Sequence, residues 1–231
     1  MFNNIRKDIA EIKKQDPAAR NSAEVFLLYS GLHAIWLHRP AHWLYRKKIF
    51  FLARFISQIS RFLTGIEIHP GAEIGHGVLI DHGSGVVIGE TAVVGDGCVI
   101  YQGVTLGGTG KDKGKRHPTL GKNIMVGSGA RILGPIDIGD DSKIASNAVV
   151  LQSLPPASTA VGVPARIVRV KGKKVEMMGT LRQSDPLAQE VVRLANETKL
   201  LNERLAKLEK LMNNENINKE GEMDYTKLEC V

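Results

Sequence analysis

Residues 120–150 read LGKNIMVGSGARILGPIDIGDDSKIASNAVV, and in this stretch an aliphatic residue returns at every sixth position. The period holds, with two slips, from residue 66 to residue 154, and it matches neither the 3.6-residue period of an α-helix nor the two-residue period of a strand. Its members are Ile68, Ile74, Ile80, Ile88, Val94, Ile100, Leu106, Leu120, Val126, Ile132, Ile138, Ile144 and Val150. Such a period predicts a solenoid whose coils have three flat faces, with one hexad on each face.

Compact residues and glycines support the same interpretation. A small or compact residue lies four places after most of the aliphatic residues, as at Ala72, Cys98 and Ala148, where it fits near a corner of the coil. Glycine directly follows six of the aliphatic residues, and we expect these corners to need a backbone conformation open to residues without a Cβ. These glycines are Gly75, Gly89, Gly95, Gly121, Gly127 and Gly139. The repeat resembles the left-handed parallel β-helix of the hexapeptide-repeat acyltransferases over about thirteen hexads.

The whole chain is predicted to be an α+β protein, with helices in residues 1–64 and the β-helix in residues 65–170. Helices are expected over residues 2–15, over 23–37 with Ser22 as the N-cap, and over 41–63, with Pro40 separating the last two. A solenoid must cover its terminal hydrophobic coil, so these helices are expected to cap the open end of the β-helix.

A second period begins after the polar segment 171–185, which is predicted to be a linker. Leucine recurs every seven residues from Leu187 to Leu208, and an a-position residue follows each one four places later. This seam predicts a helix over residues 186–213 that forms a three-stranded coiled coil. The Asn-, Glu- and Lys-rich residues 214–231 are predicted to be a disordered tail.

Composition excludes several classes. The chain has 231 residues and a net charge of +7, and the excess lies in residues 1–64, which hold eleven Lys or Arg against four Asp or Glu. Arg46, Lys47 and Lys48 make the densest basic cluster, but without a nucleic-acid motif they are read as a solvated helix edge. We expect no membrane span and no signal peptide, and therefore a cytoplasmic protein. Two cysteines, Cys98 on a core position and Cys230 near the end, do not form a disulfide framework.

The two slips in the repeat carry the unusual polar residues. The first contains Asp81 and His82, and the second is the glycine-rich, basic loop 107–118, which includes Arg116 and His117. Excursions from a rigid scaffold are frequent places for function. An imidazole suits a general base, and a guanidinium can grip a carboxylate through two parallel hydrogen bonds.

Several motifs are similar to those of the serine O-acetyltransferase family, over roughly residues 20–170. They are IEIHPGA at 66–72, DHG at 81–83, VIGETAV at 87–93, VTLGGTG at 104–110, RHP at 116–118 and GVPAR at 162–166. The resemblance implies transfer of acetyl from acetyl-CoA to the hydroxyl of L-serine, in cysteine biosynthesis. Acetyl-CoA is then a co-substrate, and no tightly bound cofactor is expected.

The resemblance also implies residue roles. His82 matches the general base, and Glu67 stands where many members have the Asp that orients this base. Asp81, Arg116 and His117 match residues that hold the serine amine and carboxylate. Gly108 and Ser128 are the candidates for backbone contacts with acetyl-CoA, and the loop lysines Lys111, Lys113 and Lys115 either meet its phosphates or are simply solvated.

The family further implies a homotrimer with acetyl-CoA in a groove between subunits, and feedback inhibition by cysteine. The N-terminal helical segment is short for a family in which it pairs trimers into hexamers. The family's C-terminal tail, often ending in Ile, enters the active site of O-acetylserine sulfhydrylase; this chain ends in Val231, so that partner stays open.

Three other interpretations remain. A hexapeptide acetyltransferase for a sugar or other hydroxyl acceptor fits the repeat, although a neutral sugar offers Arg116 no carboxylate. Trimeric β-helices also include zinc carbonic anhydrases, which need three converging imidazoles, but the spacing of His69, His76, His82 and His117 matches no ligand pattern. His38 and His42 are likewise not predicted to bind metal. A non-catalytic scaffold would not need both His82 and Arg116.

Overall fold

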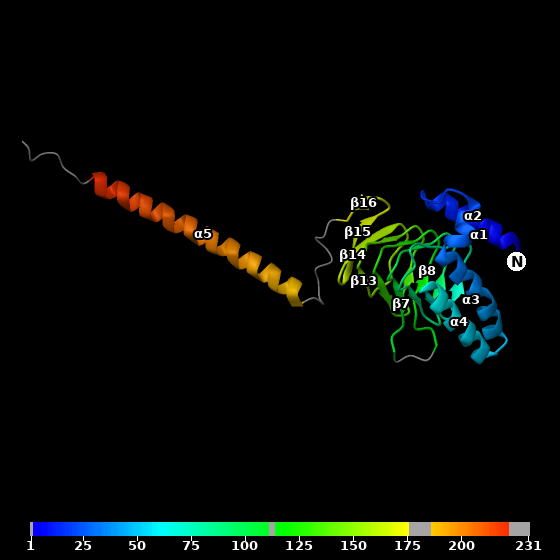
Figure 1. Cartoon of the computed structure of the whole chain (residues 1–231). Coiled ribbons are helices and arrows are strands. Elements are labelled where there is room, and N and C mark those ends of the chain that lie inside the picture. The colour runs from blue at the N-terminus through cyan, green and yellow to red at the C-terminus, as the bar shows by residue number, and fades with distance from the viewer. Residues whose placement is uncertain (1, 111–113, 176–185, 222–231) are drawn as a thin grey trace, which may run out of the picture. The chain divides into compact units, whose positions relative to one another are not determined.

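The computed structural model of the chain describes residues 2–110, 114–175 and 186–221. The chain divides into two units, Met1–Glu176 and Met177–Val231, and the division lies inside the predicted linker. Four helices precede the β-helix: α1 (Phe2–Gln15), α2 (Ser22–Leu28), α3 (Ser30–Arg46) and α4 (Phe50–Thr64). Figure 1 shows α3 and α4 side by side at the start of the coils.

The hexads form a three-faced parallel β-helix, as the period predicts. Face 1 contains β1 (Glu67–Ile68), β4 (Val87–Ile88), β7 (Thr105–Gly107), β10 (Arg131–Leu133) and β13 (Val149–Val150). Face 2 contains β2 (Glu73–Ile74), β5 (Val93–Val94), β8 (Thr119–Leu120) and β11 (Asp137–Ile138). Face 3 contains β3 (Leu79–Ile80), β6 (Val99–Ile100), β9 (Met125–Val126), β12 (Lys143–Ile144) and β14 (Ser158–Gly162), followed by β15 (Ala165–Val170) and β16 (Lys173–Lys174). From β1 to β14, successive strands therefore lie on different faces, and strands one coil apart pair with each other.

The aliphatic residues of the repeat stack in register inside the coils. Ile68 is the partner of Ile88, which in turn is the partner of Leu106 on the next coil. Most of these side chains, and the compact residues four places later, are buried, and the stack continues from the helices at Ala34 and Ile35 to Ala160. Cys98 lies in this core as a free cysteine; burial raises the pKa of its thiol to about 11.

The six glycines that follow the aliphatic residues have a different role from the predicted one. None of them has a positive φ; instead, a Cβ at Gly95 or Gly121 would overlap the backbone or side chain of the next coil. Left-handed conformations occur two residues farther on, for example at Gly77 and Gly97 and at Asn123. The prediction was wrong in mechanism: close approach of stacked coils, rather than φ, excludes a side chain at these six positions.

The N-terminal helices cap the first coil, which confirms that prediction. Their bounds differ: the N-cap of α2 is Asn21, whose side chain accepts from the Glu24 N–H at 2.8 Å, and α3 begins only at Ser30. Pro40 does not break a helix but lies inside α3. We attribute this to contacts on both sides of the proline. His38 donates from Nε2 to the Ala72 carbonyl at 3.1 Å, and His42 donates from Nδ1 to the Pro70 carbonyl at 2.8 Å.

An ion pair between two of the N-terminal helices also contacts the first coil. Asp8 of α1 pairs with Arg39 of α3 at 2.5 Å and accepts a hydrogen bond from the Gly77 N–H at 3.2 Å. Ile12 of α1 is buried with Val25, Leu32 and Leu79. Helix α4 ends at Gly65, whose φ of 72° closes the helix through a hydrogen bond to the Arg61 carbonyl. The four N-terminal helices α1 to α4, which we term the cap, are therefore joined to the first coil of the β-helix at several points.

The far end of the β-helix closes with antiparallel strands. β14 continues face 3 in parallel with β12, β15 pairs antiparallel with β14, and β16 pairs antiparallel with β15. Residues 171–175 thus belong to this sheet rather than to the predicted linker. In the second unit, α5 (Pro186–Gly221) continues eight residues beyond the predicted end at residue 213. Residues 222–231, including Cys230 and Val231, lie outside the described residues.

Within the described residues, none of the helices has the length and apolar character needed to cross a membrane.

Candidate active site

Asp81 and His82 lie where the chain turns from face 3 to face 1, which we term the His82 corner. His82 has a φ of 58° and its side chain is 72% exposed. Its Nε2 lies 3.8 Å from an oxygen of Asp81, and the Asp81 carbonyl accepts from the Gly83 N–H at 2.7 Å. The two extra residues of the first slip therefore present an imidazole to solvent with a carboxylate beside it.

A second carboxylate lies near this corner. The Tyr29 hydroxyl donates to Asp16 at 2.5 Å. Burial raises the pKa of Tyr29 to about 12, helped by its hydrogen bond to Asp16 and more weakly by the charge of Asp81. Asp16 follows directly after the helix predicted over residues 2–15, and no repeat or motif in the sequence links it to residue 81.

His82 opens onto a groove of about 420 Å³ along the outer side of face 3. The groove also contains Tyr101, Gln102, Ser128 and Ser146, and the Ser128 hydroxyl lies 3.2 Å from that of Ser146. Ser128, named from the sequence for acetyl-CoA, and His82, named as the base, are therefore brought to one groove although 46 positions separate them in the sequence.

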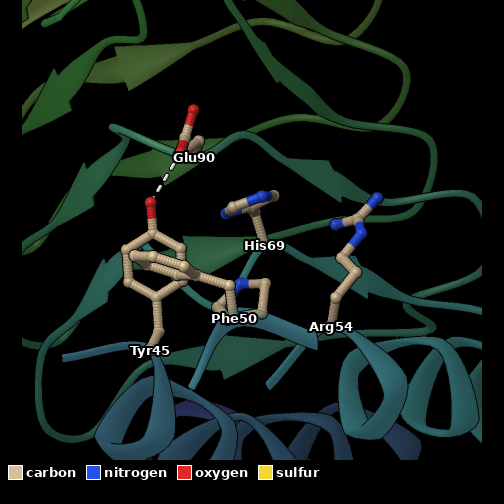
Figure 2. Close-up of a pocket in the computed structure, with 6 residues that line it drawn as sticks. Tyr45, Phe50, Arg54, His69 and Glu90 are labelled. Carbon is tan, nitrogen blue, oxygen red and sulfur yellow. Dashed lines mark hydrogen bonds between the residues drawn. The ribbon is translucent and has the colours of Figure 1, made fainter. Parts of the chain in front are cut away.

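Arg116 lies at the next corner, where the chain turns from face 1 to face 2, which we term the Arg116 corner. Its guanidinium Nη2 donates to Glu90 Oε2, and the Tyr45 hydroxyl donates to Glu90 Oε1 at 2.6 Å. The hydrogen bond from Tyr45, and then that from Arg116, holds the pKa of the Glu90 carboxyl below its ordinary value against the effect of burial. Figure 2 shows Tyr45 and Glu90 meeting across a pocket of about 390 Å³ that Arg54 and His69 also line.

His117 is fixed beside Arg116 by Thr91. The Thr91 hydroxyl accepts from the backbone N–H groups of Arg116 and His117, at 3.0 and 3.1 Å, and donates to His117 Nδ1 at 2.9 Å. The Thr91 backbone N–H also donates to Nδ1, at 3.2 Å, so this nitrogen is an acceptor and the ring proton is on Nε2. Burial, with the Arg116 charge, lowers the pKa of His117. His117 is thus a neutral hydrogen-bond donor through Nε2.

Glycines make room for this arrangement. A Cβ at Gly89 would overlap the His117 ring, and a Cβ at Gly108 would lie 3.0 Å from His117 Nε2 and 3.1 Å from Arg116. Gly108, which was predicted from the sequence to contact acetyl-CoA, therefore lets the start of the loop pack closely against Arg116 and His117. Lys115 of the same loop donates to the Thr91 carbonyl at 2.7 Å, while Lys111 and Lys113 lie outside the described residues.

Glu67 has partners other than the predicted one within a single chain. Its carboxylate pairs with Arg54 and Arg61 of α4, each at 3.1 Å, and its side chain lies on face 1, between the two corners. The carboxylate paired with His82 among the described residues is that of Asp81.

The fold keeps the two corners apart within one chain. Four residues, 86–89, lie between Gly85 at one corner and Glu90 at the other, and a strand residue advances about 3.3 Å, so five such steps place the corners roughly 16 Å apart. The structure therefore brings together Asp81 and His82, and separately Arg116 and His117, but not the two groups with one another.

The remaining histidines serve local structure. His69 Nδ1 accepts from the Gly71 N–H at 3.0 Å, and burial, followed by the Arg54 charge, lowers the pKa of His69. Burial lowers the pKa of His38 to about 3. In the described part of the chain, no group of three or more His, Cys, Asp or Glu residues is placed to hold a metal ion.

The coil geometry and the two corners define a transferase of the hexapeptide-repeat class. Residues 117–152 match the model of the bacterial transferase hexapeptide family, six repeats. The chain is 51% identical to the serine acetyltransferase of Bacillus licheniformis, over 90% of this chain and 97% of that protein. It is 50% identical to that of Bacillus subtilis, over 75% and 80% of the two chains. The chain belongs to the serine acetyltransferase family.

Solved structures agree with this assignment. The Neisseria gonorrhoeae serine acetyltransferase in complex with serine superposes with a TM-score of 0.70 at 42% identity, over 73% of this chain and 69% of that one. The Brucella abortus enzyme in complex with coenzyme A gives a TM-score of 0.70 at 45% identity, over 72% and 67%. The predicted fold, N-terminal helices followed by a left-handed β-helix, is confirmed.

Proposed function

We propose that this chain transfers the acetyl group of acetyl-CoA to the hydroxyl of L-serine, giving O-acetyl-L-serine and CoA for cysteine biosynthesis. The observation that carries the proposal is the 51% identity to a serine acetyltransferase along nine-tenths of the chain. Relatives solved with serine and with coenzyme A support the two substrates. The family resemblance calls for no tightly bound cofactor.

In the proposed mechanism, His82 acts as the general base. Its imidazole takes the proton of the serine hydroxyl as the oxygen attacks the thioester carbonyl of acetyl-CoA. The tetrahedral intermediate collapses, the carbon–sulfur bond breaks, and the imidazolium returns the proton to the CoA thiolate. General-base catalysis of this kind contributes roughly 10²- to 10⁴-fold. The exposed position of His82 on the face 3 groove supports the role, because both reactants must reach its ring.

The substrate amino acid is proposed to bind between charged groups of both corners. Asp81 attracts the ammonium, Arg116 binds the carboxylate, and His117 donates from Nε2. The pre-set side chains of the Arg116 corner support this assignment, since a fixed guanidinium loses little freedom on binding a carboxylate. A neutral sugar acceptor would offer that guanidinium no carboxylate to bind. Glycine 108 and Ser128 are proposed to contact acetyl-CoA.

We propose that the working site forms between neighbouring subunits of a homotrimer, with His82 from one chain and Arg116 from the next. The separation of the two corners within one chain supports this. The family role of Glu67, orientation of His82, then applies across the interface. The heptad leucines of α5, of which Leu194, Leu201 and Leu208 are exposed in a single chain, support a three-stranded coil in the same assembly.

Two variants test the shared site, assayed at a serine concentration near the wild-type KM, where His82→Ala lacks the base and Arg116→Ala binds too little serine to turn over. The His82→Ala and Arg116→Ala chains are purified separately, mixed, unfolded and refolded together. If neighbours share the site, one interface in each mixed trimer is intact, and random mixing restores up to about a quarter of wild-type turnover. Chains refolded apart are the control. If the mixture shows no turnover although light scattering detects trimers, His82 and Arg116 act in a site formed by a single chain.

The reaction itself is tested by thiol release from acetyl-CoA with L-serine, beside a panel of sugars and other hydroxy amino acids. Among these acceptors, we expect only L-serine to give thiol release. Cysteine, which shares the amine and carboxylate of serine, is proposed as a competitive feedback inhibitor in the same assay. Binding of O-acetylserine sulfhydrylase through Val231 remains a proposal from the family resemblance, and a cytoplasmic location remains a proposal from the sequence composition.

A further inference from the structure

We infer that Tyr45 is a positioning residue that keeps the Arg116 guanidinium available for the substrate carboxylate. The inference rests on the proposed function, in which Arg116 binds the carboxylate of L-serine. Tyr45 acts on Arg116 through Glu90. The Tyr45 hydroxyl donates to Glu90 Oε1 at 2.6 Å, and Glu90 Oε2 accepts from Arg116 Nη2. We term this pair of hydrogen bonds the relay. Each oxygen of the Glu90 carboxylate therefore has one donor of its own.

The binding of Tyr45 and Arg116 to different Glu90 oxygens matters because a guanidinium can bind both oxygens of one carboxylate. An unoccupied carboxylate takes both prongs of an arginine in a bidentate pair, which uses the geometry that recognises a carboxylate substrate. Tyr45 occupies Oε1, so Glu90 holds Arg116 through a single oxygen. The guanidinium is fixed in direction, while its other N–H groups remain free of Glu90.

Tyr45 is itself held rigidly by the cap. Its ring packs edge-on against Phe50, with centroids 5.1 Å apart, and against His69 at 5.7 Å. Gly71 lets the ring approach, because a Cβ there would lie 3.1 Å from Tyr45 Cε1. Figure 2 shows the ring standing beside Phe50 with its hydroxyl directed at Glu90. Helix α3 thus positions the Tyr45 hydroxyl at the Arg116 corner, where the substrate carboxylate is proposed to bind.

The test is Tyr45→Phe, which keeps the ring and its packing but removes the hydroxyl. Glu90 is then free to clamp Arg116 with both oxygens, in competition with serine. We expect the KM for L-serine to rise three- to tenfold, with kcat changed less than twofold and the KM for acetyl-CoA unchanged. Trp43→Phe, at an exposed ring two residues earlier on α3, is the matched control and should change none of these.

A double-mutant cycle identifies the relay. In a Glu90→Gln background, Tyr45→Phe should add no further change in the serine KM, because the carboxylate through which it acts is gone. An unchanged serine KM in Tyr45→Phe, equal losses for both substrates, or fully additive effects in the cycle would each overturn the inference.

Calorimetric titration of L-serine separates this inference from the proposed function. If the wild-type chain binds serine without acetylating it, the proposed reaction fails, and the weaker serine binding expected of Tyr45→Phe still tests the relay. If the wild-type chain neither binds nor acetylates serine, both proposals are wrong.

Discussion

The two polar corners of the β-helix differ in how far one chain has already organised them. At the His82 corner, the imidazole is 72% exposed and its nearest carboxylate is 3.8 Å away. At the Arg116 corner, the guanidinium is 30% exposed and donates to Glu90, which also accepts from Tyr45, and the Arg116 backbone N–H donates to Thr91. A single chain therefore holds the His82 imidazole loosely and the Arg116 guanidinium firmly.

The difference follows from what covers each corner. The Arg116 corner lies beneath the cap, where His38 and His42 bond to the 70–72 turn and Tyr45 reaches Glu90. Near the His82 corner, the cap packs closely against Ile80, where a Cβ at Gly31 would overlap the Ile80 carbonyl. In the proposed function, His82 is the base and Arg116 binds the carboxylate, so substitutions at the two corners should have different effects.

The largest effect is expected from His82→Ala. Loss of the base should reduce kcat by roughly 10²- to 10⁴-fold, with little change in the serine KM and no change in assembly. Thiol release and light scattering measure the two quantities. His76→Ala is the matched control, because it removes a histidine from a turn outside both corners. Near-normal turnover in His82→Ala would show that the reactive group lies elsewhere.

Arg116→Ala should act on the other side of the comparison, through binding. Loss of a charge-assisted pair worth about 3 kcal/mol predicts a roughly 100-fold higher serine KM. Arg116→Lys, which keeps the charge but not the planar fork, should recover only part of this loss. The acetyl-CoA KM is the internal reference. Equal increases in both KM values would mean a general distortion instead of a lost carboxylate contact.

Gly89→Ala should disturb the Arg116 corner without removing a polar group. The added Cβ overlaps the His117 ring, so the ring must move away from Thr91. We expect a loss of about 1–3 kcal/mol in the free energy of unfolding and a raised serine KM. Urea unfolding and kinetics measure these. Gly110→Ala, where an added Cβ meets nothing within 4 Å, should be neutral.

The smallest effect concerns pH and the attachment of the cap. Burial lowers the pKa of His38 to about 3, whereas an unfolded histidine titrates near 6.5. Between these values the unfolded chain binds a proton that the folded chain does not. The free energy of unfolding therefore falls as pH decreases from 6.5, by about 1.4 kcal/mol per pH unit.

His38→Gln should flatten this dependence, because the amide still donates to the Ala72 carbonyl but does not titrate. Urea midpoints at pH 7.5 and 5.5 measure it, and His33→Gln, at the surface of the same helix, is the control. If His38→Gln keeps the wild-type slope, a different group causes the acid sensitivity.

Some errors of prediction have a common physical origin. Pro40 was expected to end a helix and the six glycines to need positive φ, because both rules consider the chain locally. Tertiary contacts overrode them: the His38 and His42 hydrogen bonds carry α3 across Pro40, and stacked coils leave no room for side chains at the glycines. The partners of Glu67 were missed for the same reason, since Arg54 and Arg61 belong to a packed helix.

The sequence alone determined the three-faced β-helix, its breaks and the identity of the polar residues at those breaks. It could do so because a six-residue period is a local property that every coil repeats. Only the tertiary structure decided that His82 shares a groove with Ser128 and that Tyr45 reaches Glu90. Those relations join residues from different coils and from the cap, and no spacing along the chain encodes how close they come.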